Sequence, residues 1–259
     1  MAREENLTPS QWVEVLLSDT APELVAKELI GGKWLPWVKT LLEFTRDSRS
    51  TLDLGSGRGE NSAVLALQGK NATLLDWSRD SLDFSRRLFA AMNLDGRFCQ
   101  ADMTKALPFA DGSFDTVFSC GVLEYFNTQT NDVILKEAFR VARRRVIMMV
   151  PNALSISYRV GKWYMESTSK WFWGGEVPAY TLKPHFRNAG SVETVEFSVA
   201  ARHSLVFLTM PGGETLKKAC VRLLKMTDHS KRALFRQGYL LVTVGDKLRE
   251  SHVAMPLFD

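Results

Sequence analysis

Cysteine and long apolar runs are both scarce in this sequence of 259 residues. The longest clean apolar stretch covers residues 146–150, far below the roughly 18 to 20 residues that a membrane-spanning helix needs. Residues 1–5 run directly into polar sequence and lack the apolar core of a secretory signal. Cys99, Cys120 and Cys220 lie far apart without metal-ligand spacing, so neither a disulfide framework nor a zinc site is predicted. We therefore expect a cytoplasmic protein with no transmembrane segment and no metal.

A strong excess of one charge sign is also missing. Lys and Arg number 33 against 29 Asp and Glu, which gives a formal net charge of +4. With 45% hydrophobic and 24% charged residues, the composition is ordinary for a globular protein and excludes a disordered or collagen-like chain. Because so mild a basic excess demands no anionic partner, nucleic acid is not an expected partner.

Two basic clusters depart from this balance. Arg140 and the arginines at 143–145 are interpreted as the solvated end of a helix, where positive charge complements the helix dipole. Between residues 217 and 236 a single acid faces an excess of basic residues, which suits an acidic partner, a phosphate-bearing substrate or a membrane surface. Ordinary solvated surface charge is the default interpretation of this region. Its acid is Asp228, and its basic residues are Lys217, Lys218, Arg222, Lys225, Lys231, Arg232 and Arg236.

Short apolar runs alternate with helical patterns from residue 50 to about residue 151. This alternation predicts a parallel sheet that is covered by helices on both faces. Residues 8–46 predict two or three earlier helices, and two last strands follow the alternating region with a helical stretch between them. The predicted strands cover residues 51–54, 72–76, 97–101, 114–120, 145–150, 192–199 and 239–244.

The most informative segment is the loop after the first predicted strand, Asp53-Leu54-Gly55-Ser56-Gly57-Arg58-Gly59-Glu60. Glycines there allow a sharp turn and a close approach of the backbone to a ligand. A dinucleotide site would need its third glycine at position 60, which is Glu60. The D-x-G-x-G-x-G arrangement instead resembles the first signature of class I S-adenosylmethionine (SAM) dependent methyltransferases. The resemblance implies that Asp53, Gly55, Ser56, Gly57 and Gly59 surround the methionine part of the cofactor.

Further candidates follow the second and third predicted strands. Asp76 lies about twenty positions beyond the glycines, where the resemblance implies a carboxylate that accepts the ribose hydroxyls. Trp77 is interpreted either as a stacking surface for adenine or as a tryptophan packed at the strand end. After the third strand, the Asp102 carboxylate and the Met103 amide would contact the amino group and a ring nitrogen of adenine.

Residues 107–125 extend the resemblance. They read L-P-F-A-D-G-S-F-D, then a strand, then V-L-E-Y, and closely resemble the loop, fourth strand and V-L-E-H of the family. Cys120, at the end of this strand, is expected to line the cofactor pocket through its backbone. Tyr125 stands where many relatives have histidine, so a histidine base cannot be carried over to that position.

The resemblance places an acceptor site beneath the segment that follows the fifth strand. Arg159, Trp163, Trp171 and Trp173 would form an apolar or cation-binding wall, which suits an aromatic, lipid-like or amine acceptor. The alternatives are packing of these rings against the N-terminal helices and stacking on RNA bases.

Transfer to a hydroxyl or ammonium acceptor also requires a general base. His185, near the start of a later helix, and Tyr125 are the candidates. The competing interpretations are a surface or capping histidine and a tyrosine that only closes the pocket.

Taken together, the motifs resemble small-molecule methyltransferases of the ubiquinone and menaquinone biosynthesis type, strongly over residues 50–151 and weakly over 180–200. The resemblance implies an α/β, Rossmann-like class I methyltransferase fold, whose seven-stranded, mostly parallel sheet has an antiparallel last strand. It implies SAM as cofactor and transfer of a methyl group to an O or N atom of a small molecule. The alternatives are a macromolecular acceptor, RNA or a protein side chain, and a non-catalytic SAM-binding partner subunit.

No linker separates a second domain. We expect one methyltransferase domain over residues 1–259, with an N-terminal helical cap at 1–48 and a SAM-binding core at 49–151. A lid without regular pattern follows at 152–180. The C-terminal part of the sheet spans 181–259 and contains a helical insertion near 211–236. Acceptor identity and oligomeric state have no signal in the sequence.

Overall fold

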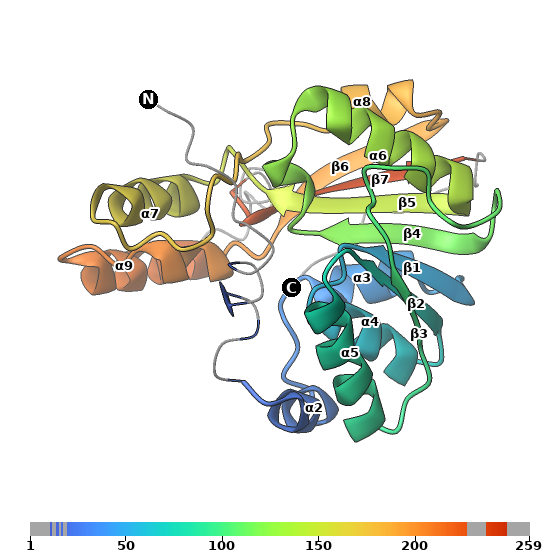
Figure 1. The fold of residues 1–259 in the computed structure, drawn as a ribbon. Helices are drawn as coiled ribbons and strands as arrows, with labels where there is room; N and C mark the ends of the chain where they lie inside the picture. Colours follow the sequence, from blue (N-terminus) through green and yellow to red (C-terminus); the bar gives the residue numbers. More distant parts are fainter. Residues whose placement is uncertain (1–10, 12–13, 16, 18–19, 227–236, 248–259) are drawn as a thin grey trace.

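The computed structural model describes residues 11, 14–15, 17, 20–226 and 237–247. Its centre is a seven-stranded sheet in the order β3-β2-β1-β4-β5-β7-β6 (Figure 1). β7 runs antiparallel to β5 and β6, whereas the other neighbouring strands are parallel, as predicted. The strands are β1 (Ser50–Leu54), β2 (Asn71–Asp76), β3 (Arg97–Gln100), β4 (Phe114–Cys120), β5 (Ala142–Pro151), β6 (Glu193–Val199) and β7 (Leu240–Asp246).

The central strands are apolar on both faces, because helices cover the sheet from both sides. In β5, Val146 and Met148 belong to the hydrophobic core on one face, while Ile147 and Met149 belong to the core on the other. This alternation follows from the two-residue period of a strand. A continuous apolar run is therefore what a parallel strand in this position requires.

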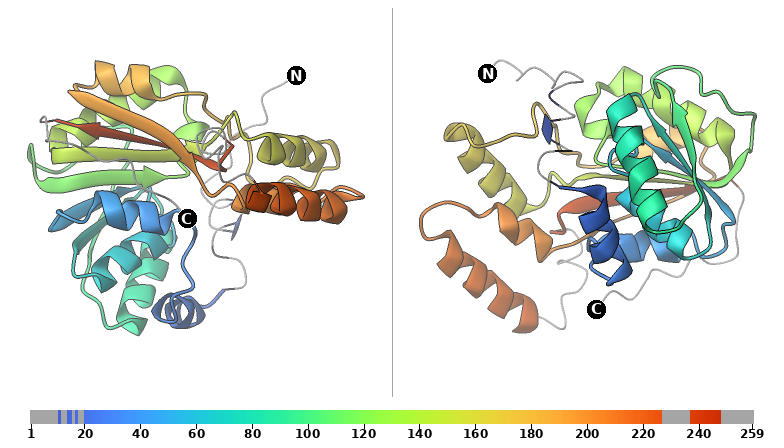
Figure 2. Two further views of the ribbon diagram at one scale, coloured as in Figure 1. Left: turned by 180° about the vertical axis from the view of Figure 1, so that it is seen from behind. Right: turned by 60° about the horizontal axis from the view of Figure 1, so that its bottom comes forward.

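Helices divide between the two faces of the sheet (Figures 1 and 2). α6 (Thr128–Val141) and α8 (Lys183–Asn188) cover one face. On the other face lie α3 (Val38–Phe44), α4 (Glu60–Leu67) and α5 (Arg79–Ala91), with α2 (Pro22–Ile30) packed on α5. Of the described helices, none combines the length and the apolar character needed to cross a bilayer.

Two helices lie beyond the sheet, past the end at which β4 and β5 finish (Figure 1). They are α7 (Ile156–Ser167) and α9 (Gly213–Met226). Two short 3₁₀ turns occur in the chain: η1 (Leu123–Tyr125) follows β4 and precedes α6, and η2 (His203–Phe207) follows β6 and precedes α9. α7 is a regular helix of 12 residues where the sequence predicted a lid without regular pattern. α9 covers part of the predicted insertion, and residues 227–236 lie outside the described residues, as do residues 1–10 of the predicted cap.

The interpretation of the arginine cluster as a helix end holds for Arg140, which lies in the last turn of α6, and is wrong for the arginines at 143–145. α6 ends at Val141, and the arginines at 143–145 begin β5. Arg145 is buried and donates from Nε and Nη2 to the two carboxylate oxygens of Asp246, at 2.6 and 3.1 Å. A third hydrogen bond, from Arg145 Nη1 to the carbonyl of Phe44 at 2.9 Å, connects the strand to α3. The arginine therefore joins β5 to the antiparallel strand β7.

Candidate cofactor and acceptor site

The strand order reverses direction at β1. From β1 the chain adds β2 and β3 on one side, and later β4 and β5 on the other. The loops that leave β1 and β4 therefore diverge at one edge of the sheet, where open α/β folds bind their ligands. A Cβ atom added at Gly55 would lie 2.7 Å from Val122 Cγ2, and Gly55 has φ +71°. The glycine loop and the loop after β4 are thus in direct contact, and the contact requires glycine.

Asp76 is held at the end of β2 by backbone amides. Its Oδ2 accepts a hydrogen bond from the Gly57 N–H at 2.8 Å, and its Oδ1 accepts one from the Ser78 N–H at 2.9 Å. Burial raises the pKa of Asp76, and these amide donors partly oppose that rise. Because a carboxylate offers about four acceptor positions, each oxygen can accept one further hydrogen bond. The geometry therefore fits a carboxylate that receives ribose hydroxyls next to the glycine loop.

Asp53 lies beneath this loop. Its Oδ2 accepts a hydrogen bond from the Ser62 hydroxyl at 2.8 Å, and burial raises its pKa to about 7. Two other polar atoms nearby, Ser56 Oγ and Asn61 Oδ1, are buried without a hydrogen-bond partner among the described residues. Orphan polar atoms of this kind are rare in folded proteins and indicate a missing polar partner. The amino and carboxyl groups of the methionine part of SAM would fit them.

The adenine side of the predicted site is more open. Trp77 is 48% exposed, so the indole is not packed into the core and is accessible for stacking. Asp102 Oδ1 accepts hydrogen bonds from the N–H and hydroxyl of Thr104, at 2.9 and 2.7 Å. The Met103 side chain is buried in the core, which leaves its backbone as the part that can contact a ligand. These roles remain predictions.

Cys120 ends β4 at the same edge. Burial raises the pKa of its thiol well above the usual range, and the nearby Glu124 and Asp53 add to the rise. The side chain is therefore a neutral thiol at physiological pH, because only a lowered pKa would make it a thiolate nucleophile.

The four predicted wall residues have different surroundings, although Arg159 and Trp163 share one side of α7. Trp171 faces the buried residues of the lid, and Lys162 Nζ lies 4.0 Å from the centre of its ring. Trp163 is 65% exposed on α7, and Arg159 is also exposed on that helix. Trp173 packs against Phe172 in the loop after α7. Of the four, Trp171 is the one that lies beside the buried residues Tyr158 and Lys162.

The two candidate bases have different surroundings. His185 Nδ1 lies 2.6 Å from Asp132 Oδ1, an interaction that joins α8 to α6 on the face of the sheet. Tyr125 lies in η1, among the loops at the carboxyl edge, and its hydroxyl donates to Glu176 Oε2 at 3.4 Å. Burial raises the pKa of Tyr125, so its hydroxyl is protonated. Tyr125 is thus placed as a hydrogen-bond donor, whereas His185 is placed between two covering helices.

Sequence reasoning missed two acids at this edge. Glu124 lies within the V-L-E-Y motif but received no role there, and it is buried in η1. Glu176 comes from the lid, where no pattern singled it out, and it is buried as well. A buried acid within a motif is a signal that could have marked Glu124. Glu176 could be found only from the tertiary structure.

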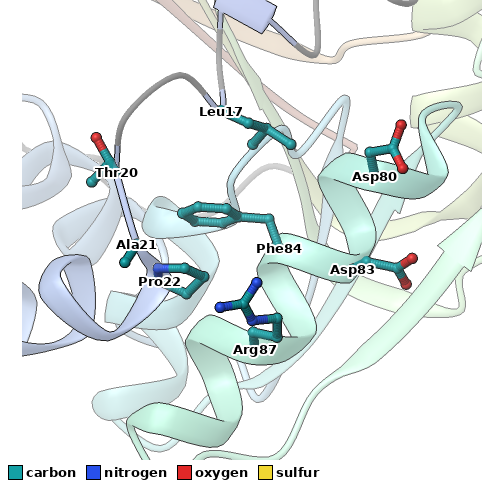
Figure 3. Close-up of a pocket in the computed structure, with 8 residues that line it drawn as sticks. All are labelled: Leu17, Thr20, Ala21, Pro22, Asp80, Asp83, Phe84 and Arg87. Atoms are coloured by element: carbon teal, nitrogen blue, oxygen red, sulfur yellow. The ribbon is translucent and has the colours of Figure 1, made fainter.

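A separate pocket of about 300 Å³ lies between α5 and the segment that leads into α2 (Figure 3). The Phe84 ring and the Arg87 side chain border it from α5. None of the predicted site residues lines it, and we assign it no role. The lining residues are Leu17, Thr20, Ala21, Pro22, Asp80, Asp83, Phe84 and Arg87.

The strand order and the loops at the switch point are those of the class I SAM-dependent methyltransferase fold. Residues 51–145 match the family described as "Methyltransferase domain". These matched residues contain the glycine loop, Asp76 and Asp102, and the methyltransferase family uses SAM as its cofactor.

Comparisons with individual proteins agree. The chain is 32% identical over 139 residues to a provisionally named methyltransferase of Bacillus subtilis, YqeM. The matched region covers 52% of this chain and 53% of that protein. It is 29% identical over 158 residues to the demethylmenaquinone methyltransferase of Thermus thermophilus, covering 56% and 70%. A solved SAM-dependent methyltransferase of Archaeoglobus fulgidus superposes with a TM-score of 0.57 at 18% identity, over 91% of this chain and 98% of that one. The chain spans about half the length of the first curated relative it matches.

Proposed function

We propose that this protein transfers a methyl group from SAM to an O or N atom of a small molecule. The observation that carries the proposal is the arrangement of Asp76, which is bound by the Gly57 amide and leaves free acceptor positions beside the glycine loop. This arrangement supports the proposal because the ribose hydroxyls of SAM can donate hydrogen bonds to such a carboxylate.

Each part of the predicted site has a role in this proposal. Asp76 holds the ribose, Trp77 stacks on adenine, and the amide of Met103 with Asp102 contacts the adenine edge. The orphan atoms of Ser56 and Asn61 bind the methionine part. The bound cofactor supplies a methyl group on a positively charged sulfur, ready for direct displacement. The protein then contributes alignment and exclusion of water more than covalent catalysis.

The lid supports a small acceptor. The Val177 N–H donates to the carbonyl of Glu124 at 2.9 Å, and the Ala179 N–H donates to the carbonyl of Pro151 at 2.9 Å. These bonds hold the lid segment directly on the loop after β4 and the end of β5. A lid held in this way would restrict access to the methyl group of a bound cofactor, which favours a small acceptor over a folded macromolecule. The matched relative from Thermus thermophilus is named for a small-molecule acceptor, demethylmenaquinone.

A docking role for the basic region at 217–236 stays a prediction. Lys217 pairs with Glu214 at 2.5 Å, whereas Lys218 and Arg222 are exposed. Asp228, Lys231, Arg232 and Arg236 lie outside the described residues.

A labelling experiment tests the proposal. The protein is incubated with SAM labelled in its methyl group and with an extract of its source cells, divided by ultrafiltration into low-mass and macromolecular fractions. We expect label in the low-mass fraction and none with the Asp76→Asn variant. Label in RNA or protein would replace the small acceptor by a macromolecular one, and no transfer to either fraction would favour a non-catalytic partner subunit.

A further inference from the structure

Buried acids and tyrosines meet where the lid covers η1. Glu176, from the lid, accepts hydrogen bonds from the hydroxyls of Tyr125, at 3.4 Å, and Tyr158. Glu124 precedes Tyr125 in η1, and its carbonyl accepts a hydrogen bond from the N–H of Val177, the residue after Glu176, at 2.9 Å. The two carboxyl groups lie near enough for Glu176 to raise the pKa of Glu124. Each of the two acids is only 6% exposed. The structure thus places two carboxyl groups in one buried site.

One oxygen of this site has no partner. Glu124 Oε2 is buried and accepts no hydrogen bond among the described residues, in contrast to Glu176, both of whose oxygens accept tyrosine hydroxyls. Leaving a buried polar atom without a hydrogen-bond partner destabilises the folded state. Packing alone therefore does not account for Glu124, and a donor from a ligand would satisfy it.

Aromatic rings form the wall around the acids. The Tyr158 ring lies 5.1 Å from Phe207 and 5.3 Å from Tyr239, and Phe207 and Tyr239 lie 4.9 Å apart. Trp171 continues the wall beside Tyr158, and the Lys162 ammonium already lies over its face. Aromatic faces attract cations through their quadrupoles. The wall therefore suits a positively charged group.

The balance of buried charge leaves room for one more cation. Lys162 is the basic residue beside Glu176, and its ion-pair partner is Glu166, at 2.6 Å. Among the described residues, the groups that interact with Glu124 are Glu176, the hydroxyls of Tyr125, Tyr158 and Tyr239, and the Cys120 thiol, and none of these groups is a base. Burial and the neighbouring Glu176 raise the pKa of Glu124 well above its usual range. A cation that enters the site would instead favour the ionised carboxylate.

This cluster adjoins the cofactor site. Glu124 follows Val122, the residue in contact with Gly55 of the glycine loop. Glu124 and Asp53 both raise the pKa of the Cys120 thiol, so both acids lie near the end of β4. A group bound by Glu124 would therefore lie beside the predicted methionine part of SAM.

We propose that the acceptor carries a primary or secondary amine, which binds as its ammonium between Glu124 and Glu176 against the tyrosine and tryptophan wall. This inference rests on the proposed function and gives it a substrate class. The competing acceptor is a neutral hydroxyl compound, which would also donate to Glu124 but would gain nothing from a second acid or from the aromatic faces.

The reaction balances with groups that are present. The bound ammonium loses one proton to the Glu124 carboxylate and becomes a neutral amine with a free lone pair. The lone pair of the amine forms the N–C bond to the methyl group while the S–C bond breaks. The electron pair of the S–C bond stays on sulfur, which becomes a neutral thioether. The product is a methylated ammonium, and the proton on Glu124 passes to solvent. Glu124 is thus the proposed general base.

Binding measurements on the protein saturated with S-adenosylhomocysteine (SAH) test this inference without turnover. Benzylamine, benzyl alcohol and benzoate share a phenyl ring with one attached carbon, and at pH 7 they carry a positive charge, no charge and a negative charge, respectively. We expect benzylamine to bind at least about tenfold more tightly than benzyl alcohol, and benzoate not to bind. We also expect benzylamine binding to release protons, measured as a buffer-dependent heat, because Glu124 becomes ionised.

The Glu124→Gln variant keeps the shape of the side chain but cannot ionise. We expect its benzylamine affinity to fall to that of benzyl alcohol and its proton release to disappear. Glu214→Gln, the same change on the exposed face of α9, should behave as the wild type. SAH affinity is measured first, because failure of SAH to bind would contradict the proposed function. Normal SAH binding with equal affinity for amine and alcohol, or with no binding of benzylamine, would overturn the amine acceptor alone.

Discussion

At the scale of single residues, the buried carboxyl group of Asp53 makes the stability of the folded protein depend on pH. Its carboxyl group is 2% exposed and has one hydrogen-bond donor, Ser62. Burial therefore outweighs that bond and raises the pKa to about 7 from an ordinary value of 3.8. Between these two values the folded protein keeps a proton that the unfolded chain has lost. Stability falls as pH rises through this range.

The Asp53→Asn variant should lack this loss, because an amide keeps the bond from Ser62 and does not ionise. We predict that raising the pH from 5 to 8 destabilises the wild type by about 2–4 kcal/mol more than the variant. Urea denaturation at both pH values measures the difference. Asp80→Asn, an exposed change in α5, serves as the control and should follow the wild type. Parallel pH profiles for the wild type and Asp53→Asn would show that the carboxyl group is not buried as described.

Residue patterns predicted the cofactor side of the site better than the acceptor side. Asp53, the glycines and Asp76 stand at strand ends, and the carboxyl ends of parallel strands meet at one edge, so spacing alone brings them together. Glu176 and Tyr158 come from the lid segment, where no strand end fixes the position of a residue. Their meeting with Glu124 depends on how the lid folds back, which no local pattern encodes.

At the scale of elements, the antiparallel strand β7 is joined to β5 by a buried ion pair. Arg145 and Asp246 face each other across the two strands, and α3 contributes the carbonyl of Phe44. Removing one member of a buried pair leaves an uncompensated charge, whereas removing both can be nearly neutral.

We predict that Arg145→Met lowers the free energy of unfolding by about 3–5 kcal/mol. The double variant with Asp246→Leu should regain much of this loss, since no buried charge remains. Equilibrium denaturation of the two variants and the wild type measures both effects. A single variant within 1 kcal/mol of the wild type, roughly the value of an exposed pair, would mean that water reaches the ion pair.

Element boundaries were predicted well where one signal dominated. β4 was predicted at its observed bounds, 114–120, because an apolar run stands between a turn and a glycine. The start of β5 was misjudged, because three consecutive arginines are typical of a helix end and their ion-pair partners lie far away in sequence. α7 was missed, since aromatic and β-branched residues weaken the helical signal and only packing against η2 reveals the buried face.

At the scale of the whole molecule, the cofactor and acceptor parts have different origins in the sequence. The family match covers residues 51–145 and contains the glycine loop, Asp76 and Glu124. Glu176, Tyr158 and Tyr239 lie beyond it. The shared part of the chain therefore explains the cofactor, and the remaining part would determine which acceptor receives the methyl group. Changes at Tyr158 or Glu176 should alter acceptor affinity and leave SAH affinity unchanged.

The most direct test of the cofactor site is calorimetric titration of SAH, run beside NAD, into the wild type and the Asp76→Asn variant. We predict micromolar SAH binding to the wild type, about tenfold to hundredfold weaker binding to Asp76→Asn, and no heat with NAD. Asp80→Asn, the same change four residues later and on the exposed side of α5, should bind SAH as the wild type does. SAH binding that is indifferent to Asp76, or heat with NAD in place of SAH, would contradict the assignment of this edge of the sheet to SAM.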